Sequence, residues 1–323
     1  MTNVGGQAVL EGVMMRTPRF WAVAVRRPDG RITAVAREAT SVAVDHRWLR
    51  LPLIRGIVAL VESLATGFRA LSVSAQYSTT APSGALSTTG EALDEEPEEV
   101  GRWALALSFV IAIGFTIALF KLTPGFATKL IGIHTGTWQF AIVEGLIKVT
   151  ILVGYLSLLQ LLPDLKRVFQ YHAAEHKAIN ALEAGDALEP AVVQRHSLIH
   201  VRCGTAFLLW VMLSSIVVFL LFNQIERPSW ASSWLWLILS RVLLLPLISA
   251  VAYEVIRFAG KHARNRLVRA LLAPGLWLQR LTTREPTLDQ IEVSIAALRR
   301  VLALEEERRV ATSRPAPLVD VMA

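Results

Sequence analysis

The 323-residue chain is 53% hydrophobic and only 18% charged, and its net charge is +7. Soluble domains are about one quarter charged, so this composition argues against an ordinary soluble protein and favours a membrane protein. The only cysteine is Cys203, which excludes an internal disulfide. The distribution of the basic residues fits a membrane surface, and no nucleic-acid partner is expected.

Residues 1–50 are predicted to form a small cytoplasmic region with a β-hairpin. Phe20–Val25 and Arg31–Ala36 are rich in strand-forming residues, and Pro28-Asp29-Gly30 between them is typical of a turn. Gly5-Gly6-Gln7 is interpreted as another turn, because it does not follow a strand.

The segment 51–77 is predicted to form a helix that lies in the membrane interface. Arg55, Glu62 and Arg69 recur at seven-residue intervals, so one stripe of the helix is charged and can stay at the polar surface. Residues 78–102 are rich in small polar and then acidic residues, which predicts a flexible linker.

Apolar blocks in residues 103–256 predict the membrane bundle. A helix needs about 20 apolar residues to cross the hydrocarbon core, and each block is close to that length. Glu144 and Lys148 lie within the second block at i,i+4 spacing and are expected to pair. The predicted fold is therefore mainly α, a polytopic helical bundle of about four transmembrane helices, with the N-terminal hairpin region and cytoplasmic helices. The four blocks are Trp103–Phe120, Trp138–Leu162, Thr205–Phe222 and Trp234–Ile256.

Basic residues predict the orientation of the bundle. Of the 33 lysines and arginines, 28 lie before the first block, in the loop 163–204 or in the tail 257–323. Cytoplasmic segments carry the excess of Lys and Arg, so both termini and the middle loop are predicted to be cytoplasmic.

Two cytoplasmic helices are expected outside the bundle. Asp164 is a candidate cap for a helix over Leu165–Ala184, and Gly185 would end it. In the tail, Thr287 and Gln290 form a capping box in front of an amphipathic helix. The apolar face of that helix is a candidate surface for a protein partner. Its residues are Leu288, Ile291, Ile295, Leu298 and Leu302.

The middle-loop helix contains a possible metal site. His172 and His176 are four residues apart, so both imidazoles project from one helical face and can hold one Zn²⁺. The order H-x-x-E-H matches the inverted zincin signature, in which Glu175 would be the general base. The alternative is a pair of exposed histidines on an amphipathic helix.

A zinc site needs at least one more protein ligand. His200 is the predicted third ligand, since it follows in the next segment near the same membrane face. Cys203 and Glu254 are the substitutes. The alternative for Cys203 is a buried free thiol, which is the usual state of a lone cysteine.

Several longer motifs resemble the YqhQ-like family of bacterial membrane proteins, a domain of unknown function (1385) labelled a predicted metal-dependent enzyme. Val201 stands where the family usually has Pro, and Ala173 where Gly is usual. The resemblance implies a bacterial cytoplasmic membrane protein, supplies no reaction, and draws attention to Glu11 and Arg202 as further site candidates. It rests on Gly5–Arg16, Pro52–Gly56, Tyr171–Lys177, His200–Thr205, Tyr253-Glu254, Pro274–Gln279 and Thr282–Pro286.

Three functions are consistent with these features. The leading one is a metal-dependent hydrolase that acts on a lipid-linked or membrane-proximal substrate. In it Glu175 would activate a water molecule on a Zn²⁺ ion held at the cytoplasmic face. The second is a non-catalytic scaffold or assembly factor with a structural metal or polar site. The third, a transporter, is disfavoured because no pair of broken helices is present.

Overall fold

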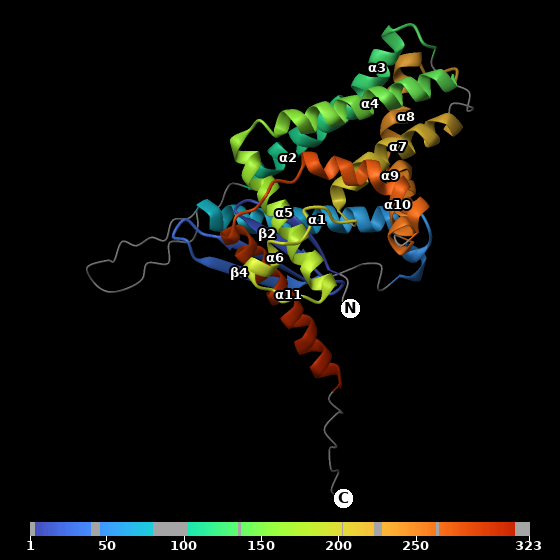
Figure 1. The fold of residues 1–323 in the computed structure, drawn as a ribbon. Coiled ribbons are helices and arrows are strands. Elements are labelled where there is room, and N and C mark those ends of the chain that lie inside the picture. Colours follow the sequence, from blue (N-terminus) through green and yellow to red (C-terminus); the bar gives the residue numbers. More distant parts are fainter. Residues whose placement is uncertain are drawn as a thin grey trace, which may run out of the picture.

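The computed structural model of the protein describes residues 4–39, 46–79, 102–134, 137–201, 203–222, 228–262 and 265–313. The predicted linker 78–102 lies almost entirely outside these residues, as does Arg202. Long helices form a bundle at one end of the molecule, and a small sheet with its covering helices forms the other end (Figure 1). The chain is thus a mainly helical protein with a small N-terminal antiparallel sheet, as predicted.

The sheet contains two hairpins in the antiparallel order β1-β2-β3-β4. The predicted hairpin is confirmed as β3 (Phe20–Arg26) and β4 (Ile32–Glu38). A second hairpin, β1 (Gly5–Val9) and β2 (Gly12–Arg16), precedes it. The predicted turn at 5–7 is wrong, because these residues pair with β2 as part of β1. Glycine has no side chain to show the alternation that marks a strand.

Helices cover both faces of this sheet. One face packs on α5 (Pro163–Ala184) and α11 (Leu288–Ser313), and α1 (Ile54–Thr79) covers the other. Two cores result: the first lies between the sheet and α5 with α11, and the second lies between the sheet and α1. Alternate strand residues point to opposite faces, so Met15 belongs to the first core and Met14 to the second. The first core contains Val13, Phe20, Ala22, Ile179, Ile291, Ile295 and Leu298, and the second contains Val9, Trp21, Val23, Val25 and Ala70.

Most of the predicted ends of the middle-loop and tail helices are present in the structure. Gly185 ends α5 in a left-handed conformation with φ 79°. The predicted Asp164 cap is wrong, because the helix begins two residues earlier than predicted, at Pro163, with Leu162 as its N-cap. The Thr287 and Gln290 capping box is present, since each side chain accepts a hydrogen bond from the other's backbone N–H.

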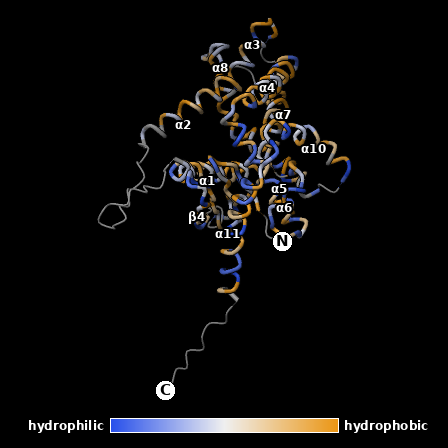
Figure 2. Tube along the Cα trace, turned by 60° about the vertical axis from the view of Figure 1, so that its left-hand side comes forward, coloured by the Kyte–Doolittle hydropathy of each residue, from blue (hydrophilic) through white to orange (hydrophobic). Residues whose placement is uncertain are grey.

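Five helical segments in the described residues are long and apolar enough to cross a membrane. Four overlap the predicted blocks, and their apolar residues dominate the bundle end of Figure 2. They are built from α2 (Arg102–Ile117), the π-helical turn Ala118–Leu122 and α3 (Thr123–Leu130), then α4 (Trp138–Leu159), α7 (Gly204–Phe222), and α8 (Ser233–Leu243) with α9 (Leu245–Lys261). The remaining helical segments are Arg47–Arg50, α6 (Pro190–Val193), α10 (Arg266–Leu278) and Gln279–Leu281.

The fifth segment is α1, the helix predicted to lie in the interface. Two of its three charged residues contact other elements: Arg55 donates to Glu254 of α9 at 2.7 Å, and Glu62 pairs with Arg16 of β2 at 3.8 Å. Arg69 is exposed, as predicted. Arg55 and Glu62 therefore join α1 to the bundle and to the sheet, whereas the prediction placed them at the polar surface. The interfacial position of α1 itself stays a prediction. Its exposed stripe is apolar and consists of Ile57, Val61, Leu64, Phe68 and Leu71.

The expected pair inside the second membrane block is present. Lys148 Nζ lies 2.7 Å from Glu144 Oε1, and neither side chain is exposed. The ammonium of Lys148 also lies over the ring of Phe219 in α7. The pair thus faces the interior of the bundle, where ionised groups in membrane helices are normally found.

Replacing Lys148 by Ala is expected to destabilise the protein by about 3–5 kcal/mol, because the Glu144 carboxylate would stay buried without its counter-charge. The midpoint of thermal unfolding in detergent, followed by circular dichroism, measures this change. The control is the double variant Glu144→Gln/Lys148→Met, which removes both charges and should lose much less stability. A single variant as stable as the double one would contradict the prediction.

Candidate metal centre

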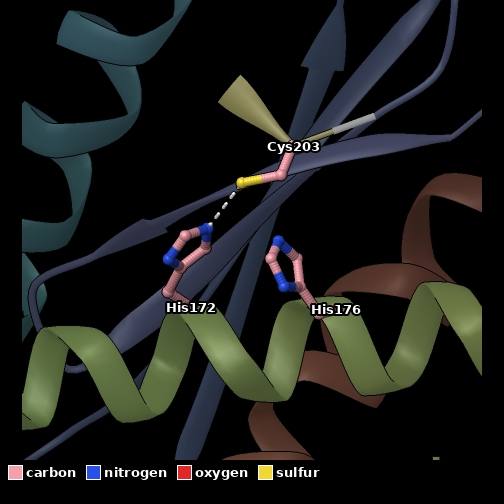
Figure 3. Close-up of side chains that lie close together, drawn as sticks. All are labelled: His172, His176 and Cys203. Carbon is pink, nitrogen blue, oxygen red and sulfur yellow. Dashed lines mark hydrogen bonds between the residues drawn. The ribbon is translucent and has the colours of Figure 1, made fainter. Parts of the chain in front are cut away.

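Helix α5 brings two histidines to one face, and the start of α7 brings a cysteine to meet them. The ring centroids of His172 and His176 are 4.4 Å apart. Cys203 immediately precedes α7 and is buried. One nitrogen of each histidine and the sulfur of Cys203 all lie within 4.8 Å of one another, and the three side chains converge (Figure 3).

Backbone carbonyls set the orientation of both rings. His172 Nδ1 is 2.8 Å from the carbonyl oxygen of Thr282, and His176 Nδ1 is 2.5 Å from that of Leu198. A carbonyl only accepts, so each Nδ1 carries a proton, and Nε2 is the atom whose lone pair the neutral ring would offer to a metal. Histidines that bind a metal are usually held in this way through their second nitrogen.

The two Nε2 atoms have the surroundings of metal ligands. His172 Nε2 lies 3.2 Å from Cys203 Sγ. His176 Nε2 is buried and has no hydrogen-bond partner among the described residues. A buried polar atom without a partner costs free energy, and coordination of a cation by this lone pair would remove that cost.

Cys203 sits where donors surround its sulfur. The backbone N–H of Thr205 points to Sγ at 3.4 Å, and the Thr205 hydroxyl lies 3.0 Å from it. Both groups belong to the first turn of α7, whose N-terminus favours negative charge. These contacts are suited to a sulfur atom that acts as a thiolate ligand.

The donor set matches Zn²⁺ better than Mg²⁺ or Ca²⁺. Two imidazoles and one thiolate are ligands that Zn²⁺ accepts, whereas Mg²⁺ and Ca²⁺ require oxygen. Bond lengths of about 2.0–2.3 Å in a tetrahedral site place ligand atoms roughly 3.3–3.7 Å apart. The His172 to Cys203 contact at 3.2 Å is already near this spacing. Three protein ligands would leave the fourth position open, as in catalytic zinc sites.

Glu175 lies next to the histidine pair and against the sheet. The side chain is 5% exposed. Burial raises its pKa to about 7, although the nearby His172 acts in the opposite direction. A Cβ added to Gly6 of β1 would lie 2.6 Å from Glu175 Cγ. Only glycine therefore allows β1 to pack against this carboxyl group.

The Gly6→Ala variant is expected to lose about 1–3 kcal/mol of stability, because its methyl group would overlap Glu175 and force the strand or the side chain to move. Gly5→Ala is the matched control, since nothing lies within 4 Å of the methyl group that it would add. Thermal unfolding of the two variants compares them directly. Equal midpoints for Gly6→Ala and the wild type would show that Glu175 can move freely.

His200, the predicted third ligand, lies near the cluster, but Cys203 is the residue that joins the two histidines. The ring centroid of His200 is 5.9 Å from that of His176, and its backbone exchanges two hydrogen bonds with the side chain of Gln279. Burial and the neighbouring His176 lower its pKa to about 4. The ring is therefore neutral at pH 7, and its 3.5 Å contact with Glu183 is not an ion pair. Coordination by His200 stays a prediction.

The structure does not bring Glu254 to the histidine pair. Its carboxylate accepts hydrogen bonds from Arg55. This ion pair attaches α1 to α9. Arg202, the other candidate from the same stretch as Cys203, lies outside the described residues.

Glu11 has a positioning role beside the cluster. It occupies the turn between β1 and β2 with φ 49°, a conformation that few non-glycine residues adopt. Its carboxylate accepts hydrogen bonds from Arg167 at 2.6 Å and from the Tyr171 hydroxyl at 3.4 Å. Both partners lie on α5 just before His172, so Glu11 fixes this helix against the first hairpin.

Sequence reasoning missed three parts of this site. The carbonyl groups of Leu198 and Thr282 carry no sequence signal, because any residue has one. Gly6 was visible within the Gly5–Arg16 motif, but only the fold shows that it faces Glu175.

Two comparisons with known proteins match most of the chain. The family model described as "Protein of unknown function (DUF1385)" matches residues 51–304. The uncharacterised protein YqhQ of Bacillus subtilis (strain 168) is 34% identical over 307 residues, which cover 93% of this chain and 92% of that protein. No solved structure matches the chain significantly.

Proposed function

This chain belongs to the DUF1385 family, and we propose that it is a metal-dependent hydrolase of the bacterial cytoplasmic membrane. Its site would lie at the cytoplasmic face and act on a membrane-proximal or lipid-linked substrate. The observation that carries the proposal is the pair of imidazoles whose Nδ1 atoms are held by carbonyls while their Nε2 atoms face Cys203.

His172, His176 and Cys203 are the residues that would hold the ion, with His200 as a further candidate. A Zn²⁺ ion bound there would supply Lewis-acid chemistry and lower the pKa of a coordinated water molecule. The Thr282 and Leu198 carbonyls keep the two rings in the ligand tautomer. The Thr205 N–H and hydroxyl hold the sulfur in place.

Glu175 is the residue that would move the proton. It precedes His176 on α5, and its carboxyl group is enclosed between this helix and Gly6. A general base must reach the water from which it takes a proton, and Glu175 directly precedes His176 and follows His172 by three residues on the same helix. The same group can return the proton to the leaving group.

Metal content tests the proposal. Protein purified in detergent should contain about one divalent ion per chain, as expected for a site with three protein ligands, and elemental analysis measures it. Apoprotein should take up Zn²⁺ to the same ratio. Protein that carries no metal and binds none on titration would exclude the enzyme and leave a scaffold with a polar core.

The packing supports the proposed orientation. The N-terminal sheet, α5 from the middle loop and α11 from the tail share one core, so all three lie on one side of the membrane. The segment that runs from α2 to α3 is one membrane helix, and α4 is the next. If both cross the membrane, α2 starts on the same side as α5. The chain from the sheet through α1 to α2 then makes no net crossing, which supports an interfacial α1.

Labelling of single cysteines in a Cys203→Ser background tests this topology. One label position, Leu51→Cys, precedes α1, and the other, Gln76→Cys, lies in its last turn. Both should react with an impermeant maleimide only after cells are opened. Trp230→Cys, between α7 and α8, is the control that should react in intact cells. Reaction of Leu51→Cys and Gln76→Cys from opposite sides would make α1 a fifth span.

A further inference from the structure

Strand β1 is an edge strand that lies beside the candidate site. It pairs with β2 on one side only, and no strand of the described residues pairs with its other side. Gly5 and Gly6 at its start are exposed. An exposed edge presents unpaired N–H and C=O groups, which can pair with another extended chain.

This edge reaches the candidate proton acceptor. Gly6 packs so closely on Glu175 that a methyl group would overlap its carboxyl group. Glu175 lies on the same helix as His172 and His176, and α5 packs along β1. A chain that extended the sheet beyond β1 would therefore run next to the side chains that carry the proposed chemistry.

A cavity adjoins the same stretch of strand. It has a volume of about 330 Å³ and is lined by the start of β1, by Met14 and Arg16 of β2, and by Ser63 and Thr66 of α1. The cavity lies on the α1 side of the strand, whereas Glu175 lies on the α5 side. Side chains of an added strand alternate between the two faces of a sheet, so this cavity is placed to receive one of them.

We propose that the substrate is an extended polypeptide that binds by adding a strand to the free edge of β1. The inference rests on the proposed function and specifies its substrate class. Main-chain hydrogen bonds to β1 would supply affinity, and the cavity would select one side chain. A lipid ester has no repeating N–H and C=O groups, so the edge favours a polypeptide over a lipid substrate.

The reaction is hydrolysis of one peptide bond by one water molecule. The water oxygen bonds to the carbonyl carbon, and Glu175 takes a proton from that water. The C–N bond then breaks as Glu175 passes the proton to the departing nitrogen. The products are a carboxylate and an amine, and no oxidant or reductant is required.

Hydroxamate binding to the cobalt-substituted protein tests the substrate class without any assay of activity. Acetohydroxamate and the hydroxamate of a tetra-alanine peptide would be titrated while the Co²⁺ absorption is followed. The peptide should bind at least about tenfold more tightly, as two or more hydrogen bonds allow. A series of peptides would then carry one N-methyl group each, at successive nitrogens. Methylation should weaken binding about three- to tenfold at every second position and have no effect between them, because only every second residue of an edge strand hydrogen-bonds to its neighbour.

A blocked edge locates the binding site. Gly5→Cys, labelled with a bulky maleimide in the metal-loaded protein, should reduce the affinity for the peptide hydroxamate to that for acetohydroxamate. Ala34→Cys, exposed on β4 at the opposite edge of the sheet, is the matched control and should have no effect once labelled. Acetohydroxamate should bind equally to both labelled proteins.

The outcomes separate the two proposals. If acetohydroxamate binds but the peptide binds no more tightly, or if labelled Gly5→Cys leaves peptide binding unchanged, the polypeptide substrate is excluded and the metal site remains. If Co²⁺ does not bind at all, the proposed function itself fails. Tighter binding of a lipid-linked hydroxamate than of the peptide would also overturn the polypeptide inference.

Discussion

Simultaneous replacement of His172 and His176 by alanine is expected to reduce the bound metal from about one ion per chain to a trace. The change removes two of three proposed protein ligands, and Cys203 alone cannot complete a tetrahedral site. Elemental analysis of detergent-purified protein measures the loss, and gel filtration confirms that the variant stays monodisperse. This is the largest single effect that the structure leads us to expect.

The control for that experiment is the double variant His46→Ala/His262→Ala. It removes the same number of imidazoles, but both residues are exposed and lie outside the cluster. Its metal content should equal that of the wild type. Metal that persists when His172 and His176 are absent would contradict the proposed centre and point to a site that includes His200 and Cys203 instead.

The Glu175→Gln variant is expected to keep its metal and lose activity by about 10²–10⁴-fold. The amide has nearly the same shape as the carboxyl group but cannot accept the proton, and general acid–base catalysis contributes an effect of this size. Hydrolysis of fluorescently labelled casein, an unfolded polypeptide, measures the rate. Metal content measured on the same sample separates loss of chemistry from loss of the site.

Glu189→Gln is the matched control, since it makes the same substitution at an exposed carboxylate at the start of α6. It should retain the wild-type rate. Equal rates for Glu175→Gln and the wild type would show that Glu175 does not transfer the proton. Loss of metal from Glu175→Gln would instead assign this residue a structural part in the site.

The sequence by itself determined the features that depend on local pattern. Apolar blocks of membrane length predicted the helices of the bundle, because a bilayer imposes that length on each crossing. The i,i+4 spacing placed His172 and His176 on one face, and Gly185 marked the end of their helix. The Glu144 and Lys148 pair was predictable for the same reason.

Only the tertiary structure decided what depends on contacts between distant segments. Cys203, not His200, meets both histidines because the segment just before α7 brings the sulfur to the face of α5 that carries them. Gly6 approaches Glu175 because α5 lies across β1, and a glycine-rich strand has no alternation from which this could be read. Arg55 and Glu62 of α1 turn inward because Glu254 and Arg16 offer them counter-charges. Spacing along one helix fixes which residues share a face, but the partners of that face are set by packing.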